Sequence, residues 1–243
     1  MNGLPNWLMH TYLSLLRNYP YRVFDFDQAS TSLNIRRESV RVILSELVKR
    51  GWLLRMRRNE YLILSPYAIS LKSNWQDKIL QREYIPIITV LGGRLLERYP
   101  SKLVSLAVFG SVVRGEAKPT SDLDILVIID GLPEKYSDRV SQMIEVIDDL
   151  RQFKFSFWKN KNIFCNFEPI ILSVEEASQT QPIYMDMVES SVIVYDKNNF
   201  LKETLGKIAE KLRKLKSERI SLTGGRWFWR LKPSVDRGEV IEI

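Results

Sequence analysis

The sequence predicts an α+β protein in which a basic, mainly helical N-terminal unit precedes a mixed sheet packed with helices. Residues 1–75 contain 11 Lys/Arg and 5 Asp/Glu, which is +6 of the +7 net charge of the chain. Apolar runs of strand length alternate with helical patterns further on, at 103–109, 122–129, 162–172 and 191–195. A charged amphipathic helix is predicted after them, over 198–219. The charge asymmetry indicates a polyanionic partner for the first unit.

The N-terminal unit is predicted to hold three helices and a hairpin. The helices are predicted over 7–18, 25–33 and 36–50, and the hairpin pairs 52–57 with 60–64. Asp25 is expected to cap the second helix, and Gly51 is expected to end the third. The hairpin is expected to turn at Arg58-Asn59.

Three helices followed by a hairpin resemble a winged helix-turn-helix. In such domains the third helix usually enters the major groove, and the hairpin, or wing, contacts phosphates. The residues expected to bind nucleic acid are Arg36, Arg37 and Arg41 on the third helix and Arg55, Arg57 and Arg58 at the wing. DNA is the expected partner and RNA the alternative. An ordinary solvated face, or a winged helix used for protein contact, would also explain these arginines.

Three parts are predicted along the chain: an N-terminal domain (1–73), a central domain (74–197), and a C-terminal helix and tail (198–243) that pack on the central domain. A linker is expected at 66–76, and the remaining helices are expected at 76–98, 134–151 and 182–189. The tail from Thr223 to Pro233 combines Trp, Phe, Arg and Lys. Its rings would either stack on bases or fold back and become buried, and burial is favoured.

One motif in the central domain suggests chemistry. The apolar run that begins near 103 ends in Gly110-Ser111, and Asp122 and Asp124 come where the next run begins. In a strand, residues two apart point the same way, about 6–7 Å apart at Cα, so the two carboxylates share a face. Such a pair can hold one Mg²⁺ or bridge two metal ions, together with substrate phosphates. A Gly-Ser turn or an Asp-x-Asp edge is common alone, but their combination between two strands indicates a metal-dependent site.

Other polar residues of the motif fit a triphosphate. Glycine lets backbone approach a ligand closely, and Ser111 can begin a short helix whose amides face phosphate. Arg114 could add a charge-assisted contact to phosphate, and Ser121 could hydrogen-bond near the carboxylates and fix the turn into the second strand.

The stretch from Gly110-Ser111 through Arg114-Gly115-Glu116-Ala117 to Ser121-Asp122-Leu123-Asp124 resembles the signature of the DNA-polymerase-β-type nucleotidyltransferases, and the small prokaryotic members above all. The resemblance covers roughly residues 76–196. It implies a polymerase-β-like domain in which Gly110 and Ser111 contact the nucleotide phosphates and Asp122 and Asp124 bind Mg²⁺, with Mn²⁺ as an alternative metal.

The family usually carries a third carboxylate that helps to deprotonate the attacking hydroxyl, and Glu168 is the best match for it. Two departures from the pattern are visible: the residue is Glu rather than the commoner Asp, and Pro169 follows it. Proline cannot donate to a strand ladder, so Pro169 predicts an edge strand or a bulge. The alternative for Glu168 is a solvated glutamate on that edge.

Composition excludes several other classes. The only cysteine, Cys165, allows no intrachain disulfide, which favours a reducing cytoplasm, and it is expected to be a small core residue. The only histidine, His10, is remote in sequence from the motif, so a His-rich zinc site or a Ser/His/Asp triad is not expected. No run of 18 apolar residues or basic-then-apolar leader occurs, so no contact with a membrane is expected.

The leading prediction is an enzyme that transfers a nucleoside monophosphate, preferably AMP from ATP, to a hydroxyl of an unidentified acceptor. The alternative is a DNA-binding transcription regulator or antitoxin-like protein whose nucleotidyltransferase half is weak or inactive. A third reading is an RNA-modifying transferase in which the basic domain grips the RNA, and a homodimer is compatible with each.

Overall fold

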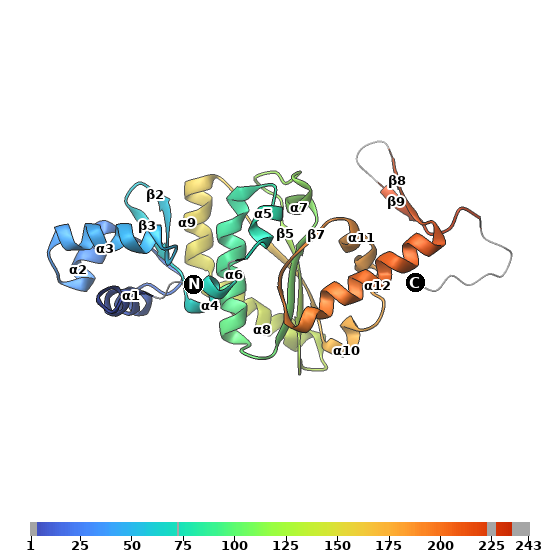
Figure 1. The fold of residues 1–243 in the computed structure, drawn as a ribbon, viewed down its shortest axis with the longest axis horizontal. Helices are drawn as coiled ribbons and strands as arrows, with labels where there is room; N and C mark the ends of the chain where they lie inside the picture. Colours follow the sequence, from blue (N-terminus) through green and yellow to red (C-terminus); the bar gives the residue numbers. More distant parts are fainter. Residues whose placement is uncertain (1–3, 72, 223–226, 235–243) are drawn as a thin grey trace.

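The computed structural model describes residues 4–71, 73–222 and 227–234. Figure 1 shows an elongated molecule with the N-terminal unit at one end and a central sheet flanked by helices. The last long helix and a small C-terminal hairpin lie at the other end.

The predicted N-terminal elements are confirmed, with one strand added. They are α1 (Asn6–Asn18), α2 (Phe26–Leu33), α3 (Arg37–Lys49), β2 (Leu53–Arg57) and β3 (Glu60–Ile63). Asp25 caps α2 in a capping box with Gln28, as its place before the helix predicts. The strand that sequence reasoning missed is β1 (Val23–Asp25), which pairs antiparallel with β3 to complete a three-stranded sheet. Three residues are too few for a recognisable alternation.

The predicted linker at 66–76 is wrong, because this segment folds into packed helices. Ser65 accepts a hydrogen bond from the amide of Ala68 and so caps α4 (Pro66–Ser70), and α5 (Trp75–Lys78) follows. Trp75 is 1% exposed, and Ala68 packs so closely on Gly93 that a Cβ at Gly93 would lie 2.6 Å from the Ala68 Cβ. Polar residues suggested a linker here, but the buried side chains between them anchor the segment.

The single helix predicted over 76–98 is also wrong, because it is broken into three pieces. After α5 the backbone of Ile79 is extended, and a short 3-10 helix, η1 (Arg82–Tyr84), leads into α6 (Ile85–Arg98). Pro86 occupies the first turn of α6, where its missing N–H costs nothing. Leu80 lies in the break and is 68% exposed, although it is apolar.

The central sheet has the strand order β6-β5-β4-β7. Its strands are β4 (Leu103–Phe109), β5 (Leu123–Ile129), β6 (Phe167–Leu172) and β7 (Ser191–Asp196). β4 is antiparallel to β5 and β7, whereas β5 and β6 are parallel. β6 begins at Phe167, so it is five residues shorter at its start than the strand predicted over 162–172. The short helix α7 (Ser111–Arg114) follows β4 directly.

Helices cover both faces of this sheet. One face packs against α6, α8 (Tyr136–Asp149) and α9 (Arg151–Lys161), and the other packs against α10 (Val174–Ala177), α11 (Ile183–Glu189) and α12 (Phe200–Leu215) (Figure 1). A second 3-10 helix, η2 (Lys197–Asn199), joins β7 to α12. The hairpin of β2 and β3 shares the first of these cores, since Met56, Leu62 and the following Leu64 pack in the same cluster as α6.

The tail forms a hairpin of β8 (Glu218–Ser221) and β9 (Trp227–Arg230), which the sequence did not predict. Trp229 packs back on the core and its indole N–H donates to the Asp186 carboxylate at 3.0 Å, whereas Phe228 is 46% exposed. The expected burial of the rings is thus partly confirmed; residues 223–226 of the tail lie outside the described residues. Within the described part of the chain, no helix has the length and apolarity that a membrane crossing requires.

Candidate active site at the end of the central sheet

Gly110 and Asp124 are in direct contact where β4 ends and β5 begins. Gly110 has φ 73° and ψ −150°, a conformation that is essentially restricted to glycine. A Cβ placed on it would lie 2.9 Å from the carboxyl carbon of Asp124 and closer still to its Oδ2. The turn after β4 therefore needs glycine both for its backbone and for the carboxylate that lies against it.

Asp124 and Glu168 lie side by side on neighbouring strands. They are Cα partners in the parallel register of β5 and β6. Asp124 lies on the same face of β5 as Leu126 and Ile128, which belong to the core under α11 and α12. Glu168 lies on the same face of β6 as Ile170 and Leu172, which pack on that core as well. Both carboxylates therefore point to the same side of the sheet.

Burial and charged neighbours both act on the pKa of Asp124. Partial burial raises the pKa of Asp124, and the neighbouring carboxylates of Asp122 and Glu168 raise it further, while Arg114 acts in the opposite direction. Burial and two neighbouring like charges disfavour the charged form of this carboxyl, so a bound cation would stabilise it. The arrangement is suited to a divalent metal ion that arrives with an anionic ligand.

The carboxylates do not form a complete metal cage. Among the described residues, no group of three or more His, Cys, Asp or Glu side chains is arranged to hold a metal ion. Asp122 and Glu168 can still raise the pKa of Asp124, because Coulomb interactions act over longer distances than metal–ligand bonds. Mg²⁺ is commonly held by one or two carboxylates and completed by phosphates and water, so Asp122 and Asp124 fit it in the presence of a triphosphate.

The remaining predicted residues of this site lie around the same turn. Ser111 is the first residue of α7 and is partly buried. Arg114 lies at the end of α7 and pairs with Glu116 at 2.8 Å. The Ser121 hydroxyl accepts a hydrogen bond from the Lys118 amide at 2.9 Å, so it fixes the turn into β5.

β6 is an edge strand, as Pro169 predicts. It pairs only with β5, so the N–H that proline lacks is not needed for a second ladder. Glu168 is exposed, and its side chain can reach solvent or a substrate without moving the core.

Sequence reasoning missed Lys154, which interacts electrostatically with Asp122. It comes from α9, a helix left unassigned at 151–161, although Phe153 and Phe157 show a helical i, i+4 spacing and are fully buried. Burial lowers the pKa of Lys154, and the nearby Cys165, Asp148 and Asp122 oppose that effect. Burial also raises the pKa of the Cys165 thiol to about 12, as expected of a small core residue rather than a nucleophile.

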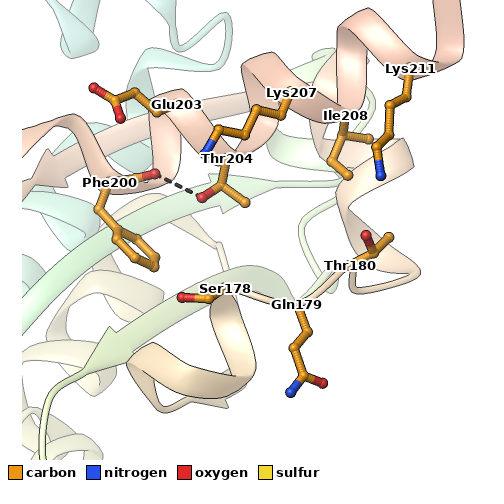
Figure 2. A pocket seen from close by; sticks show the side chains of 9 residues that line it. All are labelled: Ser178, Gln179, Thr180, Phe200, Glu203, Thr204, Lys207, Ile208 and Lys211. Atoms are coloured by element: carbon orange, nitrogen blue, oxygen red, sulfur yellow. Dashed lines mark hydrogen bonds between the residues drawn. The ribbon is translucent and has the colours of Figure 1, made fainter.

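Among the described residues, two of the cavities that lie outside this turn border α12 and α9. One, of about 250 Å³, is bounded by α12 and the Ser178–Thr180 loop, with Lys211 pointing from the helix toward the loop and Lys207 lying along the helix beside Thr204 (Figure 2). None of its lining residues belongs to the predicted site. The other, of about 290 Å³, lies against α9 and includes Lys154 and Cys165.

The six predicted nucleic-acid-binding arginines are all exposed. Three of them make contacts: Arg37 pairs with Asp27 at 2.6 Å and lies over the Phe26 ring, Arg41 lies over the same ring, and Arg57 pairs with Glu60. Arg36 and Arg41 flank Arg37 on the first turns of α3, and Arg55 and Arg58 lie on or beside β2. The structure places them in two groups, one on α3 and one at the hairpin.

Comparison with known proteins identifies the class of the central domain. Residues 91–180 match the nucleotidyltransferase domain family, a range that contains the turn, both aspartates and Glu168. Over 122 residues the chain is 27% identical to a putative protein adenylyltransferase of Methanocaldococcus jannaschii, which covers 49% of this chain and 77% of the relative. The chain is therefore a nucleotidyltransferase by class.

Likeness to solved structures is weaker. A toxin–antitoxin crystal structure with AMP-PNP has a TM-score of 0.33 and 15% identity, and covers 51% of this chain and 87% of that one. The MntA–HepT toxin–antitoxin structure has a TM-score of 0.31 and 14% identity, and covers 56% of this chain and 92% of that one.

Proposed function

We propose that the protein transfers AMP from ATP to a hydroxyl acceptor at the turn that joins Gly110 to the three carboxylates. The observation that carries the proposal is the contact of Gly110 with Asp124, together with the register that sets Asp124 beside Glu168. The choice of AMP over other nucleotides is supported by the adenylyltransferase relative.

In this proposal each residue has one role. Asp122 and Asp124 hold Mg²⁺, which when bound neutralises phosphate charge as it develops. Gly110 and Ser111 present backbone and hydroxyl to the triphosphate, Arg114 adds positive charge, and Ser121 keeps the turn into β5 fixed. Catalysis then comes mainly from positioning and charge neutralisation.

Glu168 is proposed to accept the proton of the attacking hydroxyl. The acceptor oxygen forms a bond to the α-phosphorus, and the bond from that phosphorus to the bridging oxygen breaks, so pyrophosphate leaves. The exposed position of Glu168 beside Asp124 suits a base that has to meet an incoming acceptor.

We also propose that residues 1–73 form a winged helix-turn-helix that binds nucleic acid, followed by the transferase domain (74–197) and a C-terminal part (198–243). The support is the order of three helices and a hairpin together with exposed arginines on α3 and at the wing. DNA is favoured over RNA because the third helix of such domains usually reads the major groove.

The test measures two quantities in the presence of Mg²⁺: the incorporation of label from α-labelled ATP and the release of pyrophosphate. The variant Asp122→Asn with Asp124→Asn should abolish incorporation and leave binding to duplex DNA unchanged. Asp130→Asn, an exposed aspartate just past the other end of β5, is the matched control and should keep full activity. Undiminished incorporation in the double variant would refute the proposal.

A second candidate is a DNA-binding regulator whose transferase half senses nucleotide without turning it over. It is favoured by one observation, the departure of the third carboxylate from the family pattern: Glu168 stands where Asp is commoner, and Pro169 follows it. Duplex binding with steep salt dependence, together with nucleotide binding but no pyrophosphate release from any NTP, would support it.

A further inference from the structure

The hairpin of β2 and β3 is held against α9 of the central domain. The Asn160 side chain on α9 donates to the Glu60 carboxylate at 2.9 Å, and Arg57 of the hairpin pairs with the same carboxylate. Figure 1 shows α3, the hairpin and α9 in this order along the molecule, and α3 and α9 both contact β2. A long partner that lies along α3 and the hairpin would therefore meet α9 next.

The helix α9 carries an excess of positive charge. Residues 151–167 contain four Lys/Arg and no Asp/Glu. Arg151, Phe155 and Lys159 are spaced four residues apart and all are exposed, so they form one ridge on the solvent side of the helix. Arg151 pairs with Asp148 at 2.8 Å, whereas Lys159 forms no salt bridge with any residue that the structure describes. The charge of Lys159 is therefore available to a ligand.

Lys159 lies on the side of α9 that borders the hairpin. It is the residue before Asn160, which donates to Glu60 of the hairpin. Burial acts to raise the pKa of Glu60, but hydrogen bonds from Arg57 and Asn160 and the positive charges of Arg57 and Lys159 lower it below its ordinary value. The ammonium group of Lys159 is thus close enough to the hairpin to interact with its carboxylate.

Positive charge therefore continues from the hairpin onto α9. Glu60 is the only acidic residue in the segment 47–76, and its charge is offset by its pairing with Arg57. Arg55 and Arg58, on or beside β2, are exposed, as is Lys159 on the neighbouring helix. Exposed cations that gather on adjacent elements are the electrostatic signature of a surface that contacts the phosphates of a nucleic acid.

We propose that duplex DNA bound by α3 and the hairpin also lies against α9, where Lys159 contacts a backbone phosphate. This inference rests on the proposed nucleic-acid binding of residues 1–73 and extends the binding surface onto the central domain. A phosphate contact carries no base recognition, so it adds affinity and salt dependence for a duplex of any sequence. Because Asn160 and Glu60 join α9 to the hairpin, the contact also fixes the position of the DNA relative to the central domain.

The test measures the affinity of the full-length protein for a fluorescently labelled DNA duplex by anisotropy, over a series of salt concentrations. Lys159→Met keeps the aliphatic stem but removes the charge. It should lower the slope of log affinity against log salt by about 0.9 and weaken binding about fourfold at about 0.2 M salt. Lys159→Arg keeps the charge and should keep the wild-type slope. The matched control is Lys207→Met, at an exposed lysine of α12, which should bind the duplex as the wild type does.

Comparison with Arg58→Ala separates this inference from the DNA binding on which it rests. If Arg58→Ala lowers the slope and Lys159→Met does not, the DNA does not reach α9; the contact is then overturned, and DNA binding by residues 1–73 stands. If the wild type binds no duplex even at low salt, the proposed DNA binding fails and the contact fails with it. Lys159 is exposed, so Lys159→Met should keep the melting temperature of the wild type. A slope that falls only together with the melting temperature would also overturn the contact.

Discussion

Replacing Gly110 with alanine should disable the site through a contact of a single methyl group. The new Cβ would lie 2.9 Å from the Asp124 carboxyl carbon, whereas ordinary van der Waals contact begins at 3.4 Å, so this carbon must retreat by at least 3.4 − 2.9 = 0.5 Å. The oxygen Oδ2 is closer and must retreat further. A misplacement of about 1 Å can cost about 10²-fold in rate, and that is the loss we expect in AMP transfer.

The same substitution strains the backbone. With φ 73° and ψ −150°, alanine at this position should lower the free energy of unfolding by about 1–3 kcal/mol. The matched control is Gly206→Ala, since Gly206 lies on the exposed face of α12 and a Cβ there meets nothing within 4 Å. That control should raise the stability by about 0.5–1 kcal/mol and leave transfer intact.

The test measures the rate of AMP transfer from labelled ATP and, by chemical denaturation, the free energy of unfolding, for Gly110→Ala and for Gly206→Ala. If Gly110→Ala transfers AMP at the wild-type rate, the reasoning from the Gly110–Asp124 contact is refuted. If Gly110→Ala lowered the stability but not the rate, the backbone strain would be real, but AMP transfer would not depend on the position of the Asp124 carboxylate.

Three further predictions concern Glu168, Glu176 and the arginines of α3. Glu168→Gln should lower kcat about 10²–10⁴-fold, while the affinity for ATP with Mg²⁺ stays constant. The matched control is Glu203→Gln, at an exposed glutamate of α12, which should change neither kcat nor the affinity for ATP in the same assay. The pKa of Glu176 lies below the ordinary value of 4.5, because it accepts from the Ser173 amide and pairs at 2.6 Å with Arg139, which is 7% exposed. Its contribution to stability is thus present above pH 4.5 and lost as the pH falls through the lowered pKa. The Glu176 side chain is 43% exposed and solvent screens the pair, so Glu176→Gln should lower the unfolding free energy by at most about 1 kcal/mol at pH 7 and flatten its decline in acid. Denaturation from pH 7 to pH 3 would reveal or contradict this. Arg41→Ala should weaken duplex DNA binding and lower the slope of log affinity against log salt by about 1, whereas Arg213→Ala on α12 should not, and equal slopes for both would argue against α3 as the contact.

Where local pattern decides the structure, the sequence was sufficient. The apolar stripe of α3, the capping by Asp25 and the limits of β4 follow from spacing and side-chain chemistry alone. The approach of Gly110 to Asp124 was predictable for the same reason, because β4 and β5 are neighbouring antiparallel strands.

What the sequence did not reveal depends on tertiary contacts. The segment around Trp75 has the polar residues of a linker, but the Trp75 indole donates to the Leu71 carbonyl and its ring is buried. Lys154 could not be placed, because its nearness to Asp122 arises from tertiary packing that sets its ammonium over the Phe167 ring of β6. The β8–β9 hairpin needs α11 as a support, through Trp229 with Asp186 and Arg219 with Glu189.

The most direct measurement is a crystal structure of the protein with Mn²⁺ and a non-hydrolysable ATP, in which anomalous scattering locates the metal. We expect the metal between the carboxylates of Asp122 and Asp124 and the triphosphate against Gly110-Ser111, with Glu168 facing the α-phosphorus. Mn²⁺ bound away from both aspartates, or a triphosphate seated instead between Lys207 and Lys211, would contradict the assignment of this site.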